Sequence, residues 1–99
     1  MKITFRQSGG FMGVVRGCTV DTSALAGAER THVEALVQAS TLTASFSRQT
    51  EGGRDRRQYE ITIEYEATHV HVVCDDGCLP EPARPLIAYL AGCARPVAP

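Results

Sequence analysis

The chain has 99 residues, a length that suits one domain. Its composition, 43% hydrophobic and 21% charged residues, is that of an ordinary globular protein and excludes intrinsic disorder. Ten basic and eleven acidic residues leave a formal charge of -1, which argues against binding to nucleic acid or anionic lipid through bulk charge. No apolar run approaches the roughly 20 residues of a membrane helix, and the start lacks a secretion signal. We therefore expect a soluble, cytoplasmic protein.

The domain prediction covers the whole chain. We expect a single domain over residues 1–99, in which residues 94–99 form a loose tail. The cysteine spacing matches no disulfide-stapled scaffold, so we expect the thiols to be reduced. They are Cys18, Cys74, Cys78 and Cys93.

The first half of the chain predicts a hairpin and a helix. Alternating apolar and polar residues predict a strand over residues 2–7 and a second strand over residues 14–21, after a glycine-rich tip. Apolar residues at helical spacing then predict an amphipathic helix over residues 28–40. Residues 47–56 contain no bulky apolar residue and predict an exposed loop.

The second half predicts a second hairpin and a second helix. Residues 59–65 and 69–74 alternate clearly, and a turn at Glu66-Ala67 would place Ile63 opposite Val70. A helix is predicted over residues 81–93, with Pro82 in its first turn. The order β-β-α-β-β-α predicts an α+β fold, a four-stranded mainly antiparallel sheet with two helices packed on one face.

Metal and catalytic chemistry find little support in the sequence. Zinc binding by His69, His71, Cys74 and Cys78 is opposed by strand parity, which points both histidines to the face opposite Cys74. The common hydrolytic and nucleotide-binding motifs are absent from the sequence. We therefore expect no metal, no cofactor and no enzymatic activity.

Two segments remain as candidates for binding. Four arginines within ten positions could bind nucleic acid or another acidic ligand, although acidic neighbours and the lack of an aromatic favour a solvated loop; they are Arg48, Arg54, Arg56 and Arg57. The hairpin tip is Ser8-Gly9-Gly10-Phe11-Met12-Gly13. Its two large apolar side chains could anchor a partner or fold back over the sheet, and the sequence does not decide between these.

Several segments in series resemble the emfourin family of protealysin inhibitors. The resemblance runs from Ile3 through Ser8-Gly9-Gly10-Phe11 and Val33-Glu34-Ala35-Leu36-Val37, and then through Tyr59-Glu60-Ile61-Thr62-Ile63-Glu64 to Arg84-Pro85-Leu86-Ile87. It implies a mixed α/β protein that inhibits thermolysin-like zinc metallopeptidases non-covalently, with loops inserted into the active-site cleft. It also implies such a peptidase as partner; we expect a monomer and no membrane or nucleic-acid partner.

The predicted topology suggests where the binding residues lie. If the first helix runs back along the sheet, the loops at residues 8–13, 47–56 and 75–79 meet at one end and form a composite binding edge. The alternatives are a nucleic-acid or acidic-ligand binder using the Arg48 to Arg57 loop, and a structural subunit using the outer sheet face. The candidate partner-binding residues are Ser8, Gly9, Gly10, Phe11, Met12, Gly13, Arg54, Arg56, Asp75 and Asp76.

Overall fold

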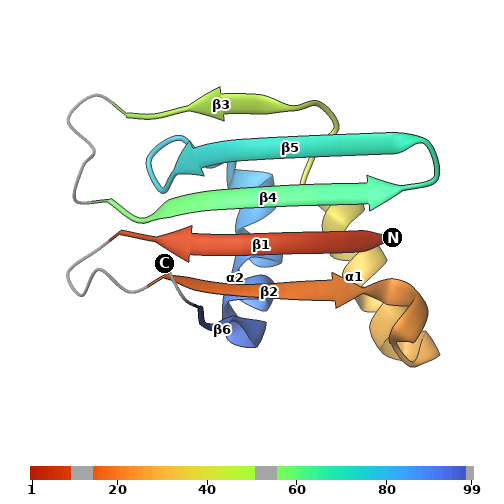
Figure 1. Cartoon of the computed structure of the whole chain (residues 1–99). Helices are drawn as coiled ribbons and strands as arrows, with labels where there is room; N and C mark the ends of the chain where they lie inside the picture. The colour runs from red at the N-terminus through yellow and green to blue at the C-terminus, as the bar shows by residue number, and fades with distance from the viewer. Residues whose placement is uncertain (10–14, 51–55, 98–99) are drawn as a thin grey trace.

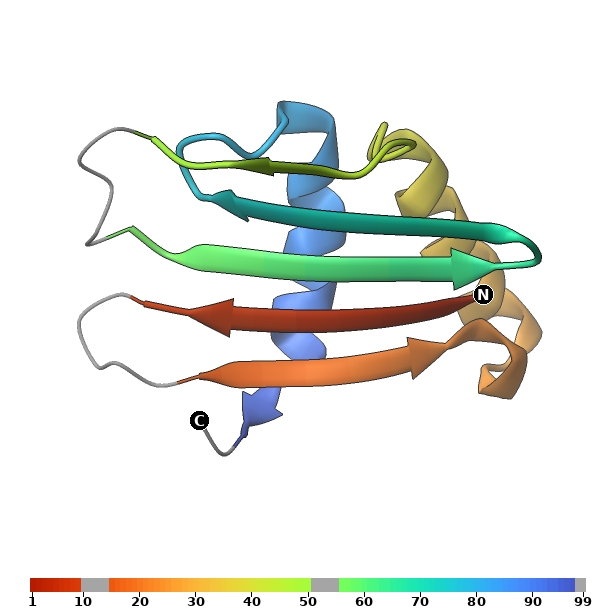
Figure 2. The same cartoon turned by 45° about the horizontal axis from the view of Figure 1, so that its top comes forward.

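The computed structural model describes residues 1–9, 15–50 and 56–97. In these residues six strands form one sheet in the order β3-β5-β4-β1-β2-β6, in which only β3 and β5 pair in parallel (Figure 1). The strands are β1 (Lys2–Ser8), β2 (Arg16–Asp21), β3 (Phe46–Arg48), β4 (Gln58–Tyr65), β5 (Thr68–Asp75) and β6 (Arg95–Pro96). The helices are α1 (Gly27–Ala39) and α2 (Arg84–Cys93), and both cover the same face of the sheet (Figure 2). The predicted α+β class and the single helical layer are confirmed.

The four long strands follow from the alternation of apolar and polar residues. Ile3, Phe5 and Ile61 are fully buried on the face toward the helices, whereas their neighbours along the strands point to the open face. The predicted register of the second hairpin is confirmed, because Ile63 lies opposite Val70. A register shift of one residue would turn every one of these side chains toward water, so the core fixes the pairing.

The two helices close the core with one apolar stripe each. α1 buries Val33 and Val37, and α2 buries Leu86, Ile87 and Leu90 against the sheet. Burying each such side chain contributes about 1.5–3 kcal/mol to folding. A separate 3-10 turn, Glu81–Ala83, precedes α2, so the helix predicted over residues 81–93 divides into two parts. In the described part of the chain, neither helix has the length and apolarity to cross a membrane.

The sheet has two edge strands that the four-stranded prediction lacks. β3 overlaps the start of the predicted exposed loop, residues 47–56. Its first residue, Phe46, lies before that loop and packs partly buried on the core, and its last residue, Arg48, is exposed. β6 lies within the predicted loose tail, where Arg95 pairs with Gly17. The preceding Ala94 is buried at the end of α2 and directs the chain back to β2. Strands of two or three residues are too short to show alternation, so the prediction of four strands was wrong.

Replacing the buried Cys74 with serine should destabilise the fold without abolishing inhibition of a peptidase. Cys74 has no exposed surface, and burial raises the pKa of its thiol to about 11. A hydroxyl at this apolar position should lower the free energy of unfolding by about 1–3 kcal/mol and the melting temperature by several degrees. The exposed Cys93 provides the matched control, because Cys93→Ser should leave melting unchanged. Equal melting temperatures for the two variants, or stoichiometric zinc in chelator-washed protein, would contradict this prediction.

Candidate functional site

Three loop segments meet at one end of the sheet. β1, β3 and β5 run in the same direction, so their last residues, Ser8, Arg48 and Asp75, lie at the same end (Figure 1). We call this the loop end; its described residues are 8–9, 15–16, 48–50, 56–58 and 75–84, together with 95–97, which pair with 15–17. The sequence predicts that these loops meet only if the first helix runs back along the sheet. In the structure, the parallel pairing of β3 with β5 brings the segment after β3 to the same end as the turn after β5.

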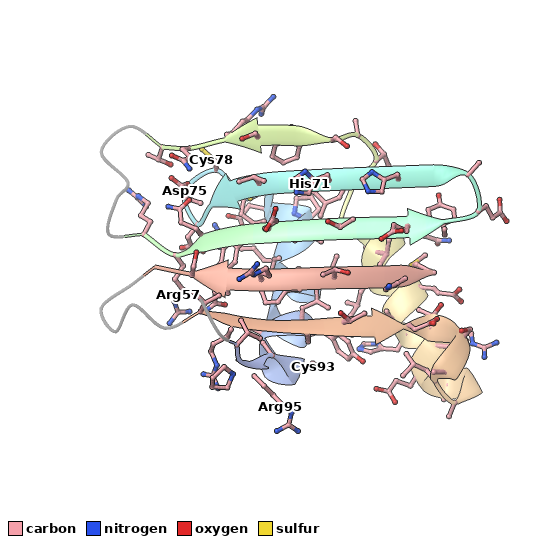
Figure 3. The ribbon with its side chains drawn as sticks, in the orientation of Figure 1. Arg57, His71, Asp75, Cys78, Cys93 and Arg95 are labelled. Atoms are coloured by element: carbon pink, nitrogen blue, oxygen red, sulfur yellow. The ribbon has the colours of Figure 1, made fainter. Side chains whose placement is uncertain are left out.

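Asp75 joins two of these segments through its buried carboxylate. The Thr50 amide donates to Oδ2 at 2.6 Å, and the Thr50 hydroxyl donates to Oδ1 at 2.9 Å. The Cys78 amide donates to Oδ1 at 2.9 Å, and the Gly77 amide is a further donor. The segment after β3 is therefore fastened to the turn after β5 by one side chain (Figure 3).

This geometry changes the role of Asp75. The sequence predicts it as a partner-binding residue, but its side chain has no exposed surface. Burial raises the pKa of its carboxyl, and the hydrogen bonds from Thr50, Cys78 and Gly77 more than offset this, so the pKa lies below the ordinary value. Asp75 is therefore a charged acceptor at neutral pH whose buried side chain positions the loops.

Two glycines permit the close approach of the segments. Gly9 has φ of +83°, and a Cβ at this position would lie 2.8 Å from the carbonyl oxygen of Arg56. A Cβ on Gly77 would overlap the Thr50 hydroxyl. Glycine is therefore required at Gly9 by both conformation and space, and at Gly77 by space.

Asp76 forms a second connection, between the turn and α2. Its Oδ1 accepts from the Tyr59 hydroxyl at 3.1 Å and pairs with Arg84 Nη1 at 3.2 Å. Its amide donates to the Arg57 carbonyl at 2.9 Å. Burial, with the Asp76 charge beside it, raises the pKa of Tyr59, which keeps that hydroxyl a donor. Unlike Asp75, the Asp76 side chain is 46% exposed and remains accessible to a partner.

The structure places some candidate residues and not others. Ser8 is partly buried at the end of β1, and Gly9 and Arg56 are exposed at the loop end. Gly10 to Gly13, which include Phe11 and Met12, lie outside the described residues, as does Arg54. Sequence reasoning missed Thr50, because a threonine in a polar loop carries no signal of a buried acceptor 25 residues away.

A hollow of about 460 Å³ lies at the opposite end of the sheet, between α1 and the strands. Its lining includes Val37, Ile63 and Val70. This hollow lies away from the loop end, and binding through loops does not require it. The hollow is therefore not part of the candidate site.

The described histidines and cysteines do not gather into a metal site. His71 Nε2 lies 2.8 Å from Glu60 Oε2 on the open face of the sheet (Figure 3). Cys74 is buried on the other face. Within residues 1–9, 15–50 and 56–97, no group of three or more His, Cys, Asp and Glu side chains could hold a metal ion.

The sheet thus gathers loop segments at one end, where Asp75 and Asp76 hold them together. Residues 5–91 match the Emfourin family model, and the chain belongs to this family. Its members are inhibitors of metallopeptidases and not enzymes, so the resemblance and the prediction that the chain is not an enzyme are confirmed. No match was found among curated proteins or among solved structures.

Proposed function

We propose that the protein inhibits a thermolysin-like zinc metallopeptidase by inserting segments of the loop end into the active-site cleft without forming a covalent bond. Family membership supports the class of target. The observation that carries the mechanism is the buried Asp75 carboxylate, which fastens the segment after β3 to the turn after β5.

Rigid support matters because a peptidase cleaves loops that adapt to its cleft. A loop that is already fixed loses little conformational entropy on binding and leaves the complex slowly. The described residues at the loop end are fastened to the turn after β5 at two points, since the Thr50 amide donates to the Asp75 carboxylate and the Asp76 amide donates to the Arg57 carbonyl. The segment after Ser8 begins at a paired strand end and continues through Gly9 against the Arg56 carbonyl. The loop end therefore has the fixed base that a resistant inhibitor needs.

The direct test is a titration of a thermolysin-like zinc peptidase with the full chain. We expect one molecule of the protein to inhibit one molecule of peptidase, and a zinc-chelating hydroxamate bound in the cleft to compete with it. Mass spectrometry after prolonged incubation should show the intact chain. Rapid cleavage, or inhibition that is unaffected by the hydroxamate, would contradict insertion into the cleft.

A further inference from the structure

Charge is divided between the two ends of the sheet. The described loop end carries six arginines and three carboxylates: Arg16, Arg48, Arg56, Arg57, Arg84 and Arg95 against Asp75, Asp76 and Glu81. Segment 51–55 adds one arginine and two acidic residues by sequence. The opposite end carries two basic and five acidic residues: Lys2 and Arg30 against Asp21, Glu29, Glu34, Glu64 and Glu66. A chain with a formal charge of -1 is thus basic at its loop end and acidic at the other.

The acidic groups of the described loop end are already engaged. Asp75 binds Thr50 and Cys78, while Asp76 and Glu81 both pair with Arg84, at 3.2 and 2.9 Å. Among the described residues, the other loop-end arginines form no ion pair with a carboxylate. They are exposed, and we call them the basic rim: Arg16, Arg48, Arg56, Arg57 and Arg95.

The basic rim crosses the whole width of the sheet. Arg48 ends β3 at one edge of the sheet. Arg95 lies in β6 at the other edge (Figure 3), one pairing from Arg16. β6 pairs Arg95 and Pro96 with Gly17 and Arg16, so Arg16 and Arg95 lie on neighbouring strands of the folded protein although they are far apart in the sequence. The binding edge therefore includes the β2–β6 corner in addition to the three predicted loops.

We infer that the basic rim contacts carboxylates of the partner, so that the inhibited peptidase carries acidic residues around the mouth of its active-site cleft. This inference rests on the proposed function. Arginine forms paired, charge-assisted hydrogen bonds with carboxylates, and exposed charges of opposite sign accelerate the encounter of two proteins. The acidic opposite end would orient the approach, because it is repelled by the same surface.

The described aromatic residues favour a protein partner over single-stranded nucleic acid. Phe46 is covered by the Arg48 guanidinium, which lies 5.3 Å from the ring centroid. Tyr59 is buried and donates to Asp76. Neither of these two rings, which lie next to the loop end, is free to stack with a base, although stacking on aromatic side chains is the usual complement to phosphate contacts.

Two charge-matched variants test the inference. Arg95→Gln removes one exposed charge from the basic rim, and Lys2→Gln removes one exposed charge from the opposite end. At 50 mM NaCl, we expect Arg95→Gln to slow association with the inhibited peptidase by about threefold and Lys2→Gln to have little effect. At 500 mM NaCl the difference should disappear, because the Debye length falls to about 4 Å. Dissociation should change less than association, and the melting temperature should stay unchanged for both variants.

The possible results separate this inference from the proposed function. If the parent inhibits the peptidase but Arg95→Gln associates as fast as the parent and Lys2→Gln, the basic rim is not a contact surface and the inference is wrong. If the parent does not inhibit thermolysin-like peptidases at all, the proposed function fails. A third possible result is that the parent fails to inhibit and is retained on a single-stranded DNA column, with weaker retention of Arg95→Gln. That result would assign the basic rim to nucleic acid and overturn both the inference and the proposed function.

Discussion

Replacing Phe11 with alanine should weaken peptidase binding by about 2 kcal/mol or more, which is roughly thirtyfold in Kd, and leave the melting temperature nearly unchanged. Phe11 lies outside the described residues, so this remains a prediction from the sequence. Gly10 and Gly13 flank it and Met12, and glycines allow a backbone to approach a cleft closely. As the family resemblance implies, the target has a pocket beside its zinc for bulky apolar side chains.

The measurement pairs the inhibition constant with thermal melting. Tyr65→Ala is a suitable control, because Tyr65 is 43% exposed and lies at the opposite end of the sheet. It should leave the inhibition constant unchanged. If Phe11 instead folds back over the sheet, Phe11→Ala should lower the melting temperature by several degrees, since lost burial costs roughly 1 kcal/mol or more in a domain of this size. Unchanged inhibition with a lowered melting temperature would refute the anchor.

The elements that were predictable from the sequence carry their own periodicity. The β4–β5 hairpin is clearest, because seven alternating residues on one strand and six on the other leave one register that buries both Ile61 and Val72. Its two-residue turn then fixes the pairing without help from the rest of the chain. The helices were predictable for a similar reason, since each has one apolar stripe.

The two short edge strands could not be predicted because their partners are distant in sequence. β3 has one apolar residue, Phe46, and owes its conformation to parallel pairing with β5. β6 contains Arg95 and Pro96, and its pairing with β2 depends on where α2 ends. In both cases tertiary contacts decide the conformation, and neither segment has a pattern long enough to reveal it.

The candidate site was predictable in outline but not in the roles of its residues. Asp75-Asp76-Gly77 is typical of an exposed turn, and both aspartates were predicted to contact the partner. Thr50 covers and binds one of them, although nothing near Thr50 in the sequence indicates this. Likewise, the proximity of Arg16 and Arg95 follows from the sheet order alone. Sequence therefore locates the loops, and the fold determines which side chains support them and which are exposed.

Asp75→Asn should lower the melting temperature by about 5–10 °C and weaken inhibition more than tenfold. The carboxylate accepts from the amide and hydroxyl of Thr50 and from the Cys78 amide. Asparagine has a similar shape but only one acceptor oxygen, and its amino group would face a donor. The loss of inhibition should exceed that of Asp76→Asn, because Asp76 is half-exposed and water can replace its contacts.

Acid unfolding provides a readout specific to the Asp75 charge. Its pKa in the folded protein lies below the unfolded value of about 3.9, so its contribution to stability is complete above that pH and is lost as the pH falls through the folded pKa. The free energy of unfolding of the parent should therefore fall more steeply between about pH 4 and pH 2 than that of Asp75→Asn. Asp21, whose pKa is also lowered by its hydrogen bonds with Ser23, is present in both proteins, so the difference isolates Asp75. Parallel acid profiles would show that the carboxylate does not fasten the loops through its charge.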